Sequence, residues 1–172
     1  MKVTSLKDIN NADKSKIVDF LDSHPIGVLA TVDDNAHPDA STIYFSTNKD
    51  LKVTFTTKRD TKKHQNINNK SKVILVVYDA ESQSAVQVRG AAVEETDPAV
   101  AQTIYHGTLR ASKHTGDDTV PPIAKISAGP YVAYSIDVEA VSFAEYGWGS
   151  SFAKALDQAN EPTKDPGTED PA

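Results

Sequence analysis

Apolar segments with the periodicity of β-strands follow one another so closely in this chain that they limit its fold more than any other feature. Within each segment, apolar residues alternate with polar ones or β-branched residues dominate, as in strands with at least one buried face. The turns between the first three segments are too short for a crossover helix, which excludes parallel βαβ units there. The pattern predicts strands at 26–32, 40–47, 51–57, 73–78 and 85–95, and one or two more within 130–146.

Three helices are predicted beside these strands. Each predicted helix has apolar residues at helical spacing or is too polar for a core strand, and each begins near a residue type that caps helices. The third has Asp97 as its N-cap and Pro98 at the first helical position. Hairpin-like strands with helices between them are typical of a mainly β protein, an antiparallel barrel with helices at its ends. The predicted helices cover 12–24, 60–70 and 98–112.

The amino-acid composition excludes several kinds of site and indicates where in the cell the protein is expected. The chain has 172 residues, 38% of them hydrophobic, which fits one domain with a sizeable core. It has no Cys, which excludes disulfides, thiolate metal sites and cysteine nucleophiles. A net charge of -6 disfavours nucleic-acid binding. The chain also lacks an apolar run long enough for a membrane span and a signal peptide, so we expect a cytoplasmic protein with neither nucleic acid nor membrane as a partner.

The C-terminal segment differs in composition from the rest of the chain. From Ser150 onward Pro, Asp, Glu and Lys dominate, and apolar residues are few. Such a composition cannot bury enough apolar surface to order the backbone. We therefore expect one folded domain over 1–149 and a disordered acidic tail over 150–172.

The segment 54–67 carries the most informative pattern, because it runs from the end of a strand into the start of a helix. Unpaired backbone N–H groups and the helix dipole favour an anion at such a start. Thr57 and Thr61 add hydroxyl groups, and Lys62 and Lys63 add positive charge in an otherwise acidic protein. The segment fits a phosphate group, although a solvated helix face with ordinary surface lysines explains the same residues.

The chain contains, in this order, the segments IGVLATV, STIYF, VTFTT, TKKHQNI and VQVRG. Over about residues 12–95 this order resembles the pyridoxamine 5'-phosphate oxidase-like FMN-binding split-barrel family. The resemblance implies a six- or seven-stranded antiparallel split β-barrel with flanking helices, and a homodimer that holds FMN between its subunits. True pyridoxamine-phosphate oxidases end in an Arg-x-His-Asp-Arg type segment, whereas this chain reads VSFAEYGWGSSFAKAL. The resemblance is therefore to the general-stress-protein-like or uncharacterised branch.

The resemblance also implies which residues bind FMN. The family holds the phosphate with a basic pair at the start of the helix after the third strand, a position that Lys62 and Lys63 occupy, with Thr61 directly before them. The strand after the first turn lines the isoalloxazine ring, and the end of the third strand and the strand before Gly90 also approach the flavin. These contacts carry over to Ser41, Thr42, Ile43, Tyr44, Thr56, Thr57 and Gln87.

Ordinary structural roles remain open for several of these residues. Ile43 and Tyr44 point to opposite faces of one strand, so one of them belongs to the core. The Ser and Thr residues also suit a half-exposed sheet without a ligand. Arg89 fits a cross-strand salt bridge, and Gly90 in the middle of a strand predicts a bulge or a close backbone approach.

The function predicted from these features is an FMN-dependent oxidoreductase with a small-molecule substrate and a possible NAD(P)H donor, and no catalytic side chain is identified. The alternative is a non-catalytic flavin or haem carrier or sensor on the same barrel. A third hypothesis is that the protein binds a deazaflavin in place of FMN. Its longer polar tail would need further positive charge, which Arg59 would have to supply. No metal site is predicted, because no metal-binding spacing links the five histidines, His24, His37, His64, His106 and His114.

Overall fold

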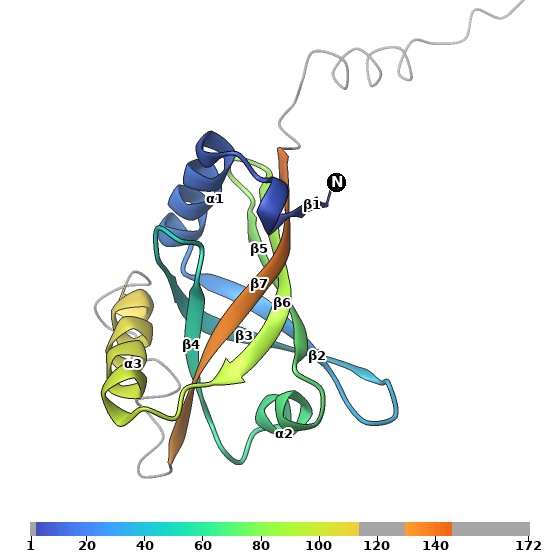
Figure 1. Ribbon diagram of the computed structural model, residues 1–172, viewed down its shortest axis with the longest axis vertical. Coiled ribbons are helices and arrows are strands. Elements are labelled where there is room, and N and C mark those ends of the chain that lie inside the picture. The colour runs from blue at the N-terminus through green and yellow to red at the C-terminus, as the bar shows by residue number, and fades with distance from the viewer. Residues whose placement is uncertain (1–2, 114–129, 146–172) are drawn as a thin grey trace, which may run out of the picture.

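The computed structural model describes residues 3–113 and 130–145 (Figure 1). Its helices are α1 (Asn11–Ser23), α2 (Lys62–Asn69) and α3 (Pro98–Lys113), with a short 3-10 helix, η1 (Leu6–Asp8). Its strands are β1 (Thr4–Ser5), β2 (Ile26–Val32), β3 (Pro38–Thr47), β4 (Val53–Lys58), β5 (Lys72–Asp79), β6 (Ser84–Glu94) and β7 (Tyr131–Glu145). The predicted tail, 150–172, lies outside the described residues.

The strands form one antiparallel sheet in the order β1-β7-β4-β3-β2-β5-β6, and β6 also pairs with β7. That last pairing closes the six longer strands into a barrel, while the two-residue β1 adds to the edge of β7. Every pairing in the described residues is antiparallel, because hairpins or short helical connections join successive strands. The predicted fold class, a six- or seven-stranded antiparallel split barrel with flanking helices, is confirmed.

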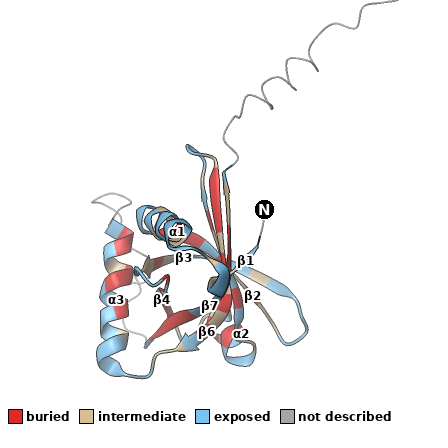
Figure 2. Ribbon diagram, turned by 45° about the horizontal axis from the view of Figure 1, so that its top comes forward, coloured by how far each residue is buried: buried red, intermediate tan, exposed pale blue. Residues whose placement is uncertain are grey.

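The apolar core fills the barrel, as the buried residues in Figure 2 show. Helices α1 and α2 lie near opposite ends of the barrel, and α3 packs outside it against β3, β4 and β7 (Figure 1). In the described residues no helix is long and apolar enough to cross a membrane. The largest fully buried side chains include Phe45, Phe55, Leu21, Leu29, Leu75 and Tyr134.

The structure moves one predicted boundary and adds two short elements. The strand expected from Leu51 begins at Val53, because Leu51 has φ 65° and its N–H donates to the Asn48 carbonyl within a turn. The left-handed backbone at Leu51 is energetically unfavourable, and burial of its side chain, which is only 1% exposed, offsets this cost. The final segment forms a single strand, β7, and the short elements β1 and η1 were not predicted.

Gly90 lies at an irregularity in the β6–β7 pairing, as its position within the strand predicts. The register between β6 and β7 shifts between Arg89 and Gly90. A Cβ atom at residue 90 would overlap the backbone carbonyl of Asp137. The β6–β7 pair therefore needs glycine at this position, which is the predicted close approach. The extra residue of the irregularity is Glu139 in β7, because Arg89 pairs with Ala140 and Gly90 with Val138.

Candidate functional site

The start of α2 forms the candidate anion site. Thr61 is the N-cap, and its Oγ1 accepts a hydrogen bond from the His64 N–H at 3.4 Å. The backbone N–H groups of Lys62 and Lys63 have no acceptor among the residues that the structure describes. Two free N–H groups at the positive end of a helix are the donors that a phosphate group requires. The predicted helix is confirmed, and it begins at Lys62 rather than at residue 60.

Lys63 differs from an ordinary surface lysine. Its side chain is half-buried, and within residues 3–113 and 130–145 no carboxylate lies at ion-pair distance. Burial lowers the pKa of the Lys63 ammonium below its ordinary value, and the neighbouring Asp39 carboxylate only partly opposes this effect. Lys62, in contrast, is exposed, and Arg59 is already paired with Glu94 at 2.9 Å. The Lys63 charge is therefore the one that most needs a compensating anion.

Two threonine hydroxyls lie at the same helix start. Thr57 Oγ1 lies 3.1 Å from Thr61 Oγ1, which in turn donates to the Lys58 carbonyl at 2.8 Å. The Thr57 hydroxyl is therefore the donor to Thr61.

Ser41 Oγ and Thr56 Oγ1 are buried and have no hydrogen-bond partner among the described residues. Unsatisfied buried hydroxyls are rare in folded proteins. Strand alternation places Ser41 on the inner face of β3 with Ile43, and Thr56 on the face of β4 opposite Thr57, so the two hydroxyls do not share one face with the α2 start.

The β3 residues that were predicted to contact the isoalloxazine ring lie on both faces of the strand. Ile43 belongs to the core, with 4% of its surface exposed, whereas Thr42 and Tyr44 point to the outer face. The prediction that one of Ile43 and Tyr44 is a core residue is confirmed. Ile43 can contact a ligand on the outer face only through its backbone.

Gln87 lies away from α2. The strand register aligns Thr42, Val28, Val76 and Gln87 in one row across β3, β2, β5 and β6. Three strand spacings of about 4.8 Å separate Gln87 from Thr42 by about 14 Å along the sheet. One chain therefore does not bring Gln87 to the other predicted contacts. Arg89 Nη2 donates to Gln87 Oε1 at 3.1 Å and forms no ion pair in the described residues, so the cross-strand salt bridge is not formed.

A buried polar network, which the sequence did not reveal, fixes α2 against β7. His64 Nδ1 lies 2.7 Å from the Tyr134 hydroxyl, and Asn68 Nδ2 donates to His64 Nε2 at 3.1 Å. The Tyr134 hydroxyl donates to Asn68 Oδ1 at 3.4 Å. Together these contacts place the His64 proton on Nδ1, because Nε2 must accept. Burial, followed by the nearby Glu94 charge, raises the pKa of Tyr134 to about 12, so this hydroxyl stays protonated at neutral pH.

Replacing Tyr134 with Phe removes the acceptor of the buried His64 Nδ1–H group. We expect the free energy of unfolding to fall by about 1–3 kcal/mol, the typical effect of leaving a buried donor unsatisfied. Urea denaturation at neutral pH measures this change. Tyr131→Phe is the matched control, since Tyr131 is 38% exposed and its hydroxyl makes no hydrogen bond among the described residues. If the free energy of unfolding falls equally in the two variants, the His64–Tyr134 network does not contribute to stability.

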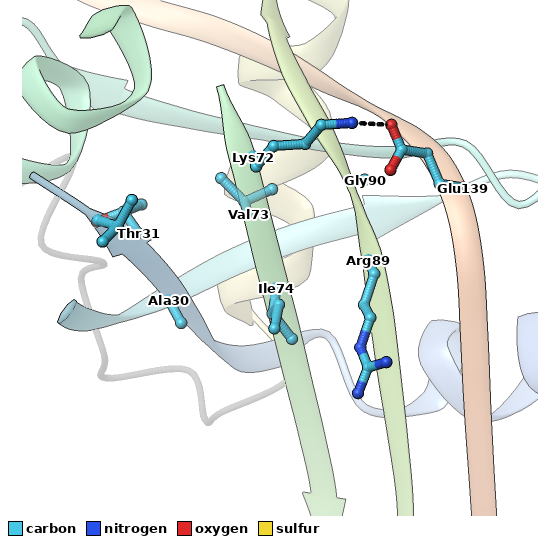
Figure 3. Close-up of a pocket in the computed structure, with 9 residues that line it drawn as sticks. Ala30, Thr31, Lys72, Val73, Ile74, Arg89, Gly90 and Glu139 are labelled. Atoms are coloured by element: carbon cyan, nitrogen blue, oxygen red, sulfur yellow. Dashed lines mark hydrogen bonds and ion pairs between the residues drawn. The ribbon is translucent and has the colours of Figure 1, made fainter. Parts of the chain in front are cut away.

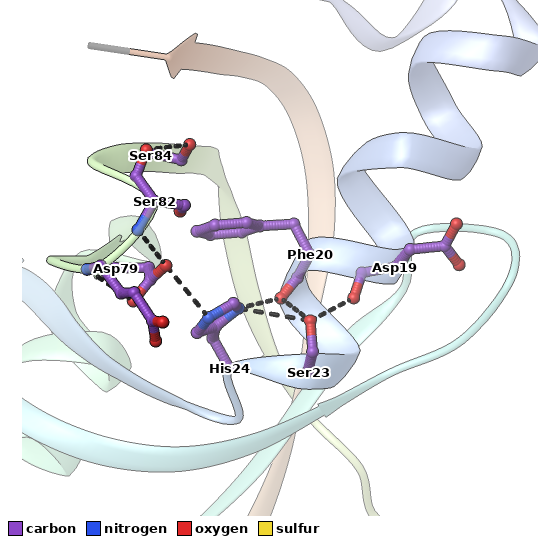
Figure 4. Close-up of polar contacts among 8 residues, drawn as sticks. Asp19, Phe20, Ser23, His24, Asp79, Ser82 and Ser84 are labelled. Atoms are coloured by element: carbon purple, nitrogen blue, oxygen red, sulfur yellow. Dashed lines mark hydrogen bonds and ion pairs between the residues drawn. The ribbon is translucent and has the colours of Figure 1, made fainter. Parts of the chain in front are cut away.

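His24 makes contacts within the fold. His24 Nδ1 lies 2.8 Å from the Phe20 carbonyl, and His24 Nε2 faces Asp79 at 3.7 Å (Figure 4). Hydrogen bonds from Ser82 hold the pKa of Asp79 below its usual range. These contacts connect the end of α1 to the β5–β6 turn. No cluster of three potential metal ligands occurs among residues 3–113 and 130–145, and His114 lies outside them.

Three solved structures share this fold. General stress protein 26 from Bacillus anthracis is 21% identical, with a TM-score of 0.54 over 76% of this chain and 92% of that chain. A pyridoxamine 5'-phosphate oxidase-related, FMN-binding protein from Nostoc punctiforme is 18% identical, with a TM-score of 0.55 over 78% and 81%. A heme-binding protein from Mycobacterium smegmatis is 14% identical, with a TM-score of 0.61 over 81% and 56%. At these identities the likeness concerns the fold alone.

Sequence comparison identifies the family. No match is found among curated proteins. The family model of pyridoxamine 5'-phosphate oxidase, however, matches residues 14–144, well over half of the chain and nearly the whole barrel. The antiparallel barrel topology agrees with this match. The chain therefore belongs to the pyridoxamine 5'-phosphate oxidase-like family.

Proposed function

We propose that this protein binds FMN at the start of α2 and acts as an FMN-dependent oxidoreductase. The observation that carries the proposal is the half-buried Lys63 ammonium, which lacks a carboxylate partner in the described residues and lies beside free backbone N–H groups. A doubly negative phosphate would compensate that charge and accept those hydrogen bonds. The FMN-binding protein from Nostoc punctiforme, which has the same fold, supports this choice of cofactor.

The residues present fit FMN. Lys62, Lys63 and Thr61 would hold the phosphate, and Thr57 would keep Thr61 in place. Asp39 limits the attraction, because its carboxylate lies close enough to act on Lys63. Bound FMN supplies hydride and electron transfer, so the chain itself need only position the cofactor. Contacts to the ring are assigned to Ser41, Thr42, Ile43, Tyr44 and Thr56, of which Ser41 and Thr56 carry buried hydroxyls that are unsatisfied among the described residues.

A homodimer would complete this site. The outer face of β2 and β5 exposes the apolar side chains Val28, Ile74 and Tyr78, an arrangement typical of an interface. Thr42 and Gln87 lie on this same face but three strands apart. Two copies that pack through this face in a two-fold arrangement would bring Gln87 of one copy toward Thr42 of the other. This arrangement would give Gln87 the flavin contact that one chain cannot.

Turnover of a nicotinamide donor tests the enzymatic part of the proposal. We expect the protein as purified to show the absorbance of oxidised flavin, and the flavin-loaded protein to oxidise NADH or NADPH when oxygen or a small quinone is the acceptor. The measurement is the loss of nicotinamide absorbance with time, and free FMN at the same concentration is the control. A flavin spectrum without oxidation of either donor would leave a flavin carrier or sensor.

A haem-binding carrier is the second candidate, and the fold shared with the heme-binding protein from Mycobacterium smegmatis favours testing it. His64 would be a poor axial ligand, because Tyr134 and Asn68 occupy both of its ring nitrogens. His37 and His106 are exposed and would be the candidates among the described histidines. A Soret band in the purified protein would favour haem over FMN. A deazaflavin gains no support from Arg59, which is paired with Glu94.

A further inference from the structure

Asp39 and Lys63 are half-buried groups of opposite charge that lie near each other without forming an ion pair. Burial lowers the pKa of Lys63, and the Asp39 carboxylate acts in the opposite direction, so it lies near the ammonium group. Neither side chain has a hydrogen-bond or ion-pair partner among the described residues. A half-buried charge loses part of its hydration, so both groups need polar partners that the described part of the chain does not supply.

The packing of α2 explains why these two side chains face each other. Asp39 is the cross-strand partner of Thr31, which Figure 3 labels on β2, and both residues point to the inner face of the β2–β3 pair. Asn66 Nδ2 donates to Thr31 Oγ1 at 3.0 Å. Lys63 lies one turn before Asn66 on the same face of α2. The contact between α2 and β2 therefore places Lys63 beside the end of β3 that carries Asp39.

Further contacts hold α2 in this place. Lys70, which follows the helix, donates from Nζ to the carbonyls of Asp33 at 2.9 Å and Asp34 at 3.0 Å. Asn69 Nδ2 donates to Asp34 Oδ2 at 2.8 Å. These bonds tie the C-terminal end of α2 to the turn between β2 and β3. The helix is therefore fixed against the hairpin before a ligand binds, which lowers the entropic cost of binding.

The two charges require different groups on a ligand. The Lys63 ammonium needs an acceptor, which the FMN phosphate would supply under the proposed function. The Asp39 carboxylate needs a donor, whereas a phosphate dianion has none and is repelled by it. In FMN the hydroxyl groups of the ribityl chain follow directly after the phosphate, and each of them can donate. A phosphorylated polyol therefore satisfies both charges, and a bare phosphate satisfies only that of Lys63.

We propose that Asp39 recognises the ribityl chain of FMN, its carboxylate accepting a hydrogen bond from a ribityl hydroxyl next to the phosphate that Lys63 holds. This inference rests on the proposed function and adds to it a residue that determines specificity. The site would select a phosphorylated polyol over other phosphate esters. The charge-assisted hydrogen bond to the hydroxyl would also offset the repulsion between the Asp39 carboxylate and the phosphate.

Riboflavin and lumiflavin separate the hydroxyl contact from the phosphate and from the ring. Both lack the phosphate, and lumiflavin carries a methyl group in place of the ribityl chain. We expect Asp39→Ala to lower the affinity for riboflavin about 10- to 100-fold, the effect of losing a charge-assisted hydrogen bond, and to leave the affinity for lumiflavin unchanged. The affinity for FMN should fall less than that for riboflavin, because loss of the carboxylate also relieves its repulsion of the phosphate.

Asp22→Ala is the matched control, since it removes one negative charge from an exposed position on α1. We expect its affinities for all three flavins to match those of the wild type. Quenching of flavin fluorescence during titration of the full-length apoprotein measures the affinities, and circular dichroism checks that each variant is folded. Asp39→Asn keeps the shape of the side chain and a neutral acceptor, so it should lose less riboflavin affinity than Asp39→Ala does.

Two results would overturn the role of Asp39 alone. One is an unchanged riboflavin affinity in both Asp39 variants, or in Asp39→Asn where Asp39→Ala does not fold, because Asp39 would then act only on the charge of Lys63. The other is a loss of lumiflavin affinity equal to the loss of riboflavin affinity, which would assign Asp39 to the ring site or to the fold. Failure of the proposed function would appear in the wild type instead. A wild type that binds riboflavin as tightly as FMN would contradict the phosphate site, and one that binds no flavin would overturn both proposals.

Discussion

Lys63→Met is expected to lower the affinity for FMN about 10- to 100-fold and to leave the affinity for riboflavin unchanged. Riboflavin lacks the phosphate, so only FMN loses a charge-assisted interaction of about 1.5–3 kcal/mol. Methionine keeps the length and the apolar stem of the lysine side chain and removes only the ammonium group. Quenching of flavin fluorescence during titration of the apoprotein measures both affinities.

Lys49→Met is the control for this experiment. Lys49 is exposed in the β3–β4 turn, so its replacement changes the net charge equally without touching the α2 site. We expect its affinities for both flavins to match those of the wild type. If the affinity of Lys63→Met for riboflavin falls as much as its affinity for FMN, Lys63 does not hold the phosphate. The proposed orientation of FMN would then be wrong.

The same substitution is expected to stabilise the apoprotein at neutral pH. Burial lowers the pKa of Lys63 in the folded state relative to the unfolded chain, so the folded state releases this proton first as pH rises. Below the folded pKa, the buried charge destabilises the fold. This penalty disappears as pH rises from the folded pKa toward the unfolded value near 10.5. In thermal unfolding, Lys63→Met should therefore have a higher midpoint temperature than the wild type at pH 7. This difference should become smaller at alkaline pH.

Saturating FMN should reverse this order of stability. A ligand that binds only the folded state raises its stability according to its affinity and concentration, so the wild type gains more than Lys63→Met. A residue that destabilises the apoprotein and stabilises the FMN complex contributes to ligand binding rather than to the stability of the fold. An apoprotein that Lys63→Met destabilises would instead indicate that the ammonium has a structural partner.

The features that the sequence predicted are those determined by neighbouring residues. Helix α2 (Lys62–Asn69) lies within the expected range 60–70, and the close approach at Gly90 lies where it was expected, because both depend on local backbone chemistry. The inward orientation of Ile43 follows likewise from strand alternation.

The features that the sequence did not reveal depend on contacts between distant segments. His64 and Tyr134 are 70 residues apart, and no periodicity indicates that their side chains meet. The left-handed turn at Leu51 needs the core to bury its side chain, so the alternating pattern placed the strand start too early. The distance between Thr42 and Gln87 follows from strand order, which spacing along the chain does not determine.

Val28→Asp is expected to convert the proposed homodimer into a monomer and to weaken FMN binding with it. Val28 is 43% exposed and lies between Thr42 and Val76 in the row that ends at Gln87. Dimerisation through this face would bury the Asp carboxylate without a partner, which is strongly unfavourable. Light scattering at a fixed protein concentration should show the mass fall by half. FMN titration should show weaker binding, because Gln87 of the second copy would no longer reach the flavin.

Val93→Asp separates this effect from the general effect of a new charge. Val93 is also 43% exposed, but it lies in the C-terminal part of β6, where its partner is Ser135 of β7. A charge there stays in water whether or not β2 and β5 form an interface, so this variant should remain dimeric and bind FMN normally. A wild type that is monomeric with flavin bound would contradict the two-subunit site. A dimeric Val28→Asp that binds FMN less well would instead place Val28 in the flavin site but outside the interface.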